Sequence, residues 1–222
     1  VYSSDHIYYW KNKKGEREHR ITKRDYVSYV GASEQFKKHL YQCALRNGYG
    51  DYEETVLLSD GAAWIANMAE EMFPDARHIL DLFHLKENVY DFARNKFRFD
   101  ESRYTPWAER ICGLLEDGKG GDVLKELDPD ENYSNCVNLY HYITMHRGHI
   151  NYPEYKSKGY FCGSGAVESG NKVVLQKRLK QSGMRWEAET AQYLLTLKSK
   201  YESGRWEKDV VAFFSDHIRT IR

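Results

Sequence analysis

The sequence predicts an α/β fold, because short apolar runs alternate with amphipathic helical patterns over residues 24–97. Residues 55–61 (TVLLSDG) and 77–83 (RHILDLF) are apolar runs of the kind that form parallel strands covered on both faces. From residue 98 to 158 no strong strand pattern occurs, which indicates an insertion made of helices. The expected architecture is therefore a sheet with parallel strands, flanked by helices and followed by a helical segment.

The composition indicates a folded chain and excludes a membrane protein. Of the 222 residues, 14% are aromatic and only 4 are Pro, whereas disordered chains are poor in aromatic residues. No stretch approaches the ~20 apolar residues of a spanning helix. Because 33 acidic residues balance 33 basic ones, any contact with nucleic acid must come from a local patch. Four Cys residues without zinc or redox spacing, and no apolar leader, predict a reducing cytoplasmic setting.

The N-terminal part is expected to contribute strands and one helix. Residues 6–10 (HIYYW) and 24–30 (RDYVSYV) are rich in β-forming residues and lie on either side of a polar turn. Ser33 is the expected N-cap of the helix that follows, and Asn47 and Gly48 are expected to close that helix.

Further helices are predicted after each apolar run, over residues 64–72 and 85–97. An aromatic run and several glycines near residue 160 mark a turn that leads into two last helices. These changes divide the chain into three expected parts: residues 1–97 with the first part of the sheet, the helical insertion 98–158, and 159–222.

Asp60 is the first candidate for a functional residue. It ends an apolar run and precedes Gly61, and carboxylates at the carboxyl ends of central strands lie where α/β sheets hold their sites. An Asp-Gly pair also forms simple turns, in which the Asp side chain accepts backbone hydrogen bonds. For a lone pair the simple turn is the better-supported interpretation.

Glu168 lies at the start of a predicted helix, in GSGAVESGNK. Lys172 follows four residues later, so a surface ion pair is one interpretation. The glycines around Glu168 favour a close approach of the backbone to another group, which is typical of a functional site. Both interpretations remain open on the residues alone.

The stretch after Glu168 is basic, and it contains no acidic residue between positions 172 and 185. Apolar residues give it a second face, and an amphipathic helix with an unopposed basic face suits a phosphate backbone. An ordinary solvated face is the alternative. The basic residues are Lys172, Lys177, Arg178, Lys180 and Arg185.

Asp81 and His84 form a D-x-x-H pattern at the end of the second apolar run. One His and one Asp are too few for a zinc site. Taken separately, each residue is more often a structural hydrogen-bonding group than a ligand.

The chain resembles the bacterial insertion-sequence transposases of the DDE type, close to the ISLre and ISKra groups and more distantly the Mutator-like ones. The resemblance rests on RDYVSYVG, RNGYGDYEETVLLSDGAAWI, FPDARHILDLFHLKENVYDFA and GYFCGSGAVESGNKVVLQKRLKQSGMRWEAETAQYLL, within residues 24–206. It implies an RNase H-like mixed sheet flanked by helices, with an all-helical insertion ahead of the helix that carries a catalytic Glu.

The resemblance also implies three metal-binding acids. It places the second at Asp60 and the third at Glu168, with Asp81 and His84 as active-site neighbours. The first Asp belongs on a strand upstream of the matched region, and Asp5 has too few residues before it for a buried strand. We therefore expect a transposase truncated at its N-terminus, with little activity by itself and without the DNA-end-binding domain of the family.

The implied chemistry is DNA cleavage followed by strand transfer, with two Mg²⁺ or Mn²⁺ ions held by Asp60 and Glu168. The two carboxylates should then lie within roughly 5–8 Å of each other. Expected partners are double-stranded DNA, at the element ends and the target, and further copies of the chain, on the nucleoid in the cytoplasm and not on a membrane. Two alternatives remain: an RNase H-like nuclease that cuts without joining, and a non-catalytic DNA-binding remnant.

Overall fold

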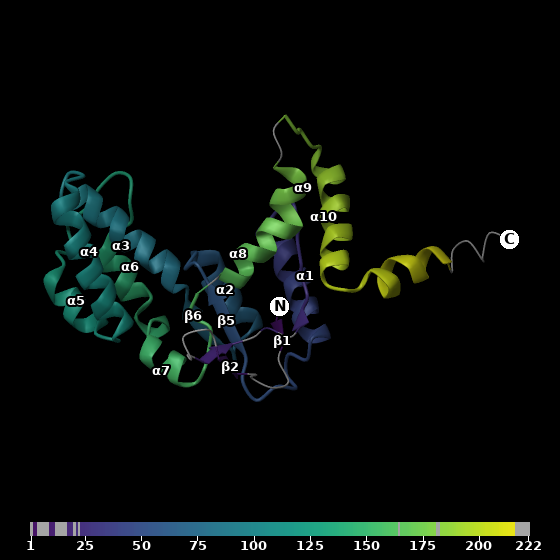
Figure 1. The fold of residues 1–222 in the computed structure, drawn as a ribbon, viewed down its shortest axis with the longest axis horizontal. Coiled ribbons are helices and arrows are strands. Elements are labelled where there is room, and N and C mark those ends of the chain that lie inside the picture. The colour runs from purple at the N-terminus through teal and green to yellow at the C-terminus, as the bar shows by residue number, and fades with distance from the viewer. Residues whose placement is uncertain are drawn as a thin grey trace. The chain divides into compact units, whose positions relative to one another are not determined.

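A computed structural model gives the fold of the chain (Figure 1). It describes residues 2–3, 9–11, 17–19, 21, 23–163, 165–180 and 183–215. The chain forms two compact units, one from residues 1–53 and 165–222 and the other from residues 54–164. These units are groups of residues in mutual contact, so the three-part division expected along the sequence stays a prediction.

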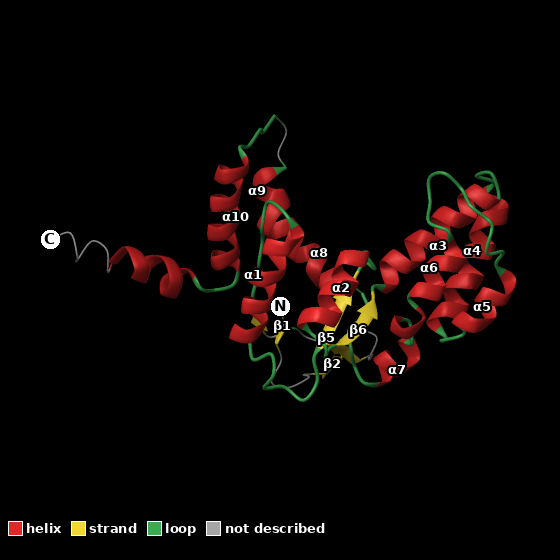
Figure 2. Ribbon diagram, turned by 180° about the vertical axis from the view of Figure 1, so that it is seen from behind, coloured by secondary structure: helices red, strands yellow, loops and turns green. Residues whose placement is uncertain are grey.

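The unit of residues 54–164 begins with a parallel pair of strands, β5 (Val56–Ser59) and β6 (Arg77–Leu80). Helix α2 (Ala63–Met72) connects them, as a crossover between parallel strands requires (Figure 2). Both apolar runs of the sequence thus form strands, and the α/β class predicted from the sequence is confirmed.

The rest of this unit is helical. All of residues 98–158 are described, and they contain helices and no strand, as the sequence predicts. Helix α3 begins earlier than predicted because the side chain of Asp81 caps it. The helices are α3 (Leu82–Lys96), α4 (Glu101–Glu116), α5 (Gly120–Glu126), α6 (Leu139–Met145), the 3₁₀ turn η1 (Arg147–His149) and α7 (Tyr152–Ser157).

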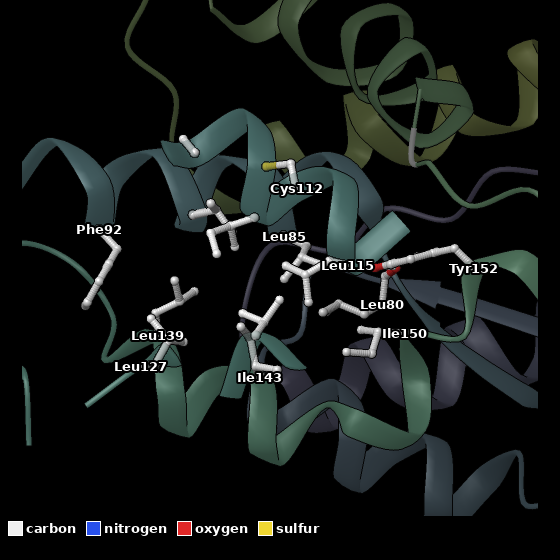
Figure 3. Packing of buried hydrophobic residues seen from close by; sticks show 14 of the residues in the cluster. Leu80, Leu85, Phe92, Cys112, Leu115, Leu127, Leu139, Ile143, Ile150 and Tyr152 are labelled. Carbon is white, nitrogen blue, oxygen red and sulfur yellow. The ribbon is translucent and has the colours of Figure 1, made fainter. Parts of the chain in front are cut away.

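One apolar core holds the strand pair and these helices together (Figure 3). Leu80 from β6, Leu85 from α3 and Leu115 from α4 are buried there with Ile143 from α6. The Tyr152 hydroxyl donates to the carbonyl of Leu80 at 3.0 Å, so the end of β6 is also tied to α7. Burial of apolar surface is the main stabilising contribution to this unit.

The other unit combines short strands with helices from both ends of the chain. Strand β1 (Tyr2–Ser3) pairs antiparallel with β4 (Lys23–Arg24), and β2 (Tyr9–Lys11) pairs with β3 (Arg17–His19). Of the predicted strand at residues 6–10, only 9–10 lie in the described part of the chain. The helical segments are α1 (Ser33–Arg46), α8 (Gly165–Asn171), the π-helical turn η2 (Lys172–Gln176), α9 (Lys177–Leu179), α10 (Ala188–Glu202) and the π-helical turn η3 (Glu207–Val211).

Two local predictions in this unit are wrong. Residues 25–30 are not a strand, because side chains satisfy their backbone: Tyr26 N donates to Ser203 Oγ, and Val30 N donates to Gln192 Oε1. Helix α1 starts after Ala32 rather than after Ser33, and no side chain caps it. The predicted end of α1 is confirmed, since Asn47 is its C-cap.

None of the helices in the described part of the chain combines the length and the apolar character that crossing a bilayer requires.

Candidate functional site

Two of the predicted site residues directly follow paired strand ends. Ser59 of β5 faces Leu80 of β6 in the parallel register, so Asp60 and Asp81 leave the sheet at the same edge. The Asp81 amide donates to the Ser59 carbonyl at 2.7 Å, which extends the strand pairing to the end of the edge. The carboxyl edge of this strand pair is therefore where acidic residues distant in sequence come together.

Asp60 is exposed and its side chain forms the local turn that its sequence also allowed. Its Oδ1 atom accepts a hydrogen bond from Ala62 N at 3.0 Å. Gly61 has φ +87°, and a Cβ there would lie 2.8 Å from Leu80 Cδ1 and 3.0 Å from His146 Nε2. Glycine is thus needed both for the backbone conformation and for the close approach of its neighbours.

Helix α6 and the residue after it contact this turn. The Tyr142 hydroxyl donates to the carbonyl of Asp60 at 3.4 Å, across 82 positions of the sequence. Burial, helped by the charges of Asp60 and Asp81, raises the pKa of Tyr142 to about 12, so the hydroxyl keeps its proton at neutral pH. His146 is also buried against Gly61. Sequence reasoning missed Tyr142 and His146, because no spacing relates them to Asp60.

Asp81 is fully buried and makes two hydrogen bonds. Its Oδ1 accepts from Phe83 N at 2.8 Å, which caps α3, and its Oδ2 is 2.7 Å from His84 Nδ1. Asp81 therefore has a structural hydrogen-bonding role and also orients a histidine, while its role as an active-site neighbour stays a prediction. Asp81 and His84 lie together because they are three residues apart at the start of one helix.

His84 is partly exposed at this edge. Burial alone would lower the pKa of His84, but the hydrogen bond and charge of Asp81, with smaller contributions from Glu87 and Asp60, raise it above its ordinary value. A protonated imidazole held by a buried carboxylate can donate from its other nitrogen to an anion. The edge thus combines an exposed carboxylate with an oriented imidazole, whose pKa is raised by the Asp81 carboxylate.

Glu168 lies in the first turn of α8 and is exposed. Two residues on, Gly170 is buried, and a Cβ there would lie 2.6 Å from Tyr26 Cε1. Because residues two apart point to nearly opposite sides of a helix, the packing at Gly170 directs Glu168 outward. This close approach explains one of the glycines around Glu168.

The predicted basic helix is only partly correct: the π-helical turn η2 interrupts it at Lys172, and it ends with α9 at Leu179, so Lys180 and Arg185 lie outside it. Lys172, Lys177, Lys180 and Arg185 are exposed, and the backbone of Arg178 lies in α9. The side chain of Arg178 lies outside the described part of the structure.

The structure brings Asp60, Asp81 and His84 together, all in the unit of residues 54–164. Glu168 belongs to the other unit, so the meeting of Asp60 with Glu168 stays a prediction. Among the described residues no group of three or more His, Cys, Asp or Glu is arranged to hold a metal ion. The early candidate Asp5 lies outside the described residues.

No protein-family model, no curated protein and no solved structure matches this chain.

Proposed function

We propose that this chain is part of the catalytic core of a DDE transposase with an RNase H-like fold, which cleaves DNA strands and joins them to target DNA. The observation that carries the proposal is the edge of β5 and β6, where Asp60 and the Asp81–His84 pair follow neighbouring strands. The exposed Glu168 would supply a further acid of the site, and the basic stretch after it would contact the DNA. The partners would be double-stranded DNA and further copies of this chain.

Asp60 and Glu168 would hold the metal, together with a third acid. Two Mg²⁺ or Mn²⁺ ions, when bound, would activate the attacking oxygen and stabilise the leaving one. The donor chemistry fits, since such ions prefer oxygen ligands. Asp60 is exposed and uses Oδ1 for the amide of Ala62, and a carboxylate has further lone pairs for a cation.

The other residues would act on the DNA and on the turn. His84, with Nδ1 bound to Asp81, would donate from Nε2 to a phosphate oxygen. Tyr142 would hold the backbone at Asp60 through its hydroxyl. The cations after Glu168 would bind phosphates on either side of the reacting bond.

A double-mutant cycle on metal binding tests whether Asp60 and Glu168 share one site. Mn²⁺ affinity is measured by calorimetry for the wild type, Asp60→Asn, Glu168→Gln and the double variant. We expect each single change to weaken Mn²⁺ at least tenfold and the double change to add little, because residues that act as one unit are not additive. Asp75→Asn and Glu187→Gln, both exposed, are the matched controls and should change nothing. Independent, additive losses, or no loss, would contradict a shared site.

Assays with DNA separate the three candidate functions. Because little activity is expected of this chain by itself, even weak cleavage and joining of a supercoiled plasmid with Mn²⁺ would support a transposase if Asp60→Asn abolishes both. Cleavage without joining would favour a nuclease. DNA binding without any Mn²⁺ binding at Asp60 and Glu168 would favour a non-catalytic DNA-binding protein.

A further inference from the structure

The helix that carries Glu168 changes its hydrogen-bonding pattern directly after α8. Over η2 (Lys172–Gln176) the backbone is π-helical, and the amide of Lys177 donates to the carbonyl of Lys172, five residues earlier. Helical geometry returns over α9. Single π-helical turns inside α-helices are rare and are frequent at functional sites.

This turn decides which side chains align along the helix. In an unbroken α-helix, residues four apart lie above one another and residues five apart point about 140° away from each other. Gln176 would then stand above Lys172. In the π-helical turn the hydrogen bond joins residues five apart, so Lys177 takes that place instead.

The packed side of the helix shows why the alignment matters. Gly170 is buried against Tyr26, and Val174, four residues later, is 5% exposed. If the α-helix continued unbroken, Lys177 would point within about 60° of Val174, toward this packed side. With the π-helical turn, Lys177 lies on the outer side with Lys172, and both are exposed.

We propose that the π-helical turn aligns Glu168, Lys172 and Lys177 into one row, and that the two lysines of this row bind successive phosphates of double-stranded DNA. Lys172 is four residues after Glu168, so the row starts at the carboxylate and continues with cations. The inference rests on the proposed function, because it places the DNA backbone beside the acid that would hold the metal. Of the five basic residues of this stretch, the proposal assigns Lys172 and Lys177 to neighbouring phosphates.

Exchange of neighbouring residues tests the register directly. The double variant Gln176→Lys/Lys177→Gln keeps the charge and the composition but moves one cation by about 100° around the helix. The measurement is the salt dependence of binding to a duplex DNA of arbitrary sequence, followed by fluorescence anisotropy. Circular dichroism and the unfolding midpoint show that each variant is folded.

We expect Lys172→Gln and Lys177→Gln each to weaken binding several-fold and to reduce the salt slope by about 1, as the loss of one phosphate contact does. The exchange variant should behave like Lys177→Gln. Lys38→Gln, which removes an exposed cation of α1, is the control and should leave the slope unchanged.

Two other results would overturn the proposal in different ways. If the exchange variant binds as tightly as the wild type or more tightly, the row does not exist, while DNA binding and the metal site stand. If the wild type shows no salt-dependent binding to duplex DNA, the row and the proposed function fail together. If Asp60→Asn and Glu168→Gln leave the Mn²⁺ affinity unchanged or weaken it additively, while the salt slopes are as expected here, only the catalytic assignment is contradicted.

Discussion

The side chains of His78, His146 and His149 lie beside one another, and His146 lies close to Gly61 in the turn after Asp60. The rings of His78 and His149 are 4.4 Å apart and those of His146 and His149 are 6.3 Å apart, measured between centroids. His78 Nε2 is 2.7 Å from Ser59 Oγ, and His149 Nδ1 is 3.2 Å from the carbonyl of His78. These contacts join β5 and β6 to the segment that follows α6.

We predict that this cluster makes stability depend on pH. Burial, followed by the charges of His149 and His146, lowers the pKa of His78 from 6.5 to about 4. Between these two values the unfolded chain binds more protons than the folded one, so the free energy of unfolding falls as pH falls through this window. The contribution is complete above pH 6.5, and the shift corresponds to a loss of roughly 3 kcal/mol near pH 4.

Urea unfolding from pH 4 to 8 tests this prediction. His78→Gln keeps a hydrogen-bonding group near Ser59 but cannot titrate, so its stability should change less with pH than that of the wild type. His141→Gln, an exposed residue of α6, is the control and should follow the wild type. Identical pH profiles for His78→Gln and the wild type would contradict the prediction.

At the scale of the element, the N-cap residue Asp81 contributes to the stability of α3 and orients the side chain of His84. Asp81 satisfies the amide of Phe83 and holds His84, and it is fully buried. We expect Asp81→Ala to lower the free energy of unfolding by roughly 0.5–2 kcal/mol, the range measured for lost N-caps. The pKa of His84 should fall as well, because the carboxylate that raises it is removed.

Unfolding in urea and an NMR titration of His84 measure the two effects. Asp100→Ala is a matched control, because Asp100 caps α4 by the same kind of bond to the amide of Ser102. It should destabilise the chain similarly and leave the pKa of His84 unchanged. A His84 that titrates identically with and without Asp81 would show that the pair does not act as described.

At the scale of the whole molecule, the two units differ in how the sequence builds them. Residues 54–164 are one continuous stretch with their own apolar core, whereas the other unit needs residues 1–53 and 165–222 together. We predict that a polypeptide of residues 54–164 folds cooperatively by itself, because a domain needs its own core and few other contacts.

Circular dichroism and urea unfolding of the polypeptide 54–164 measure this, with a single sigmoidal transition as the expected result. A polypeptide of residues 1–53 is the comparison and should remain unfolded, since its buried Asp25 pairs with Arg205 and its compact unit also contains residues 165–222. A non-cooperative transition for 54–164 would mean that its core is incomplete.

Local patterns were sufficient for much of this fold and for part of the site. Continuous apolar runs predicted β5 and β6, and helical periodicity predicted the helices that follow them, because these patterns reflect burial of one segment at a time. Asp60 and Asp81 could be placed at the ends of these runs from sequence, and the parallel pairing brings both to one edge. The Asp81–His84 contact is also local, three residues apart on one helix.

The sequence by itself therefore determined the α/β class, the parallel strand pair and the position of Asp60 and Asp81 at the ends of the two apolar runs. Only the tertiary structure decided that residues 25–30 are not a strand, because their partners Gln192 and Ser203 lie 162 and 177 positions away from Val30 and Tyr26. Only the tertiary structure shows that the Tyr142 hydroxyl contacts the carbonyl of Asp60. It also set the π-helical register at Lys172, beside the buried Gly170 and Val174, because a single π-helical turn leaves no periodic pattern in the sequence.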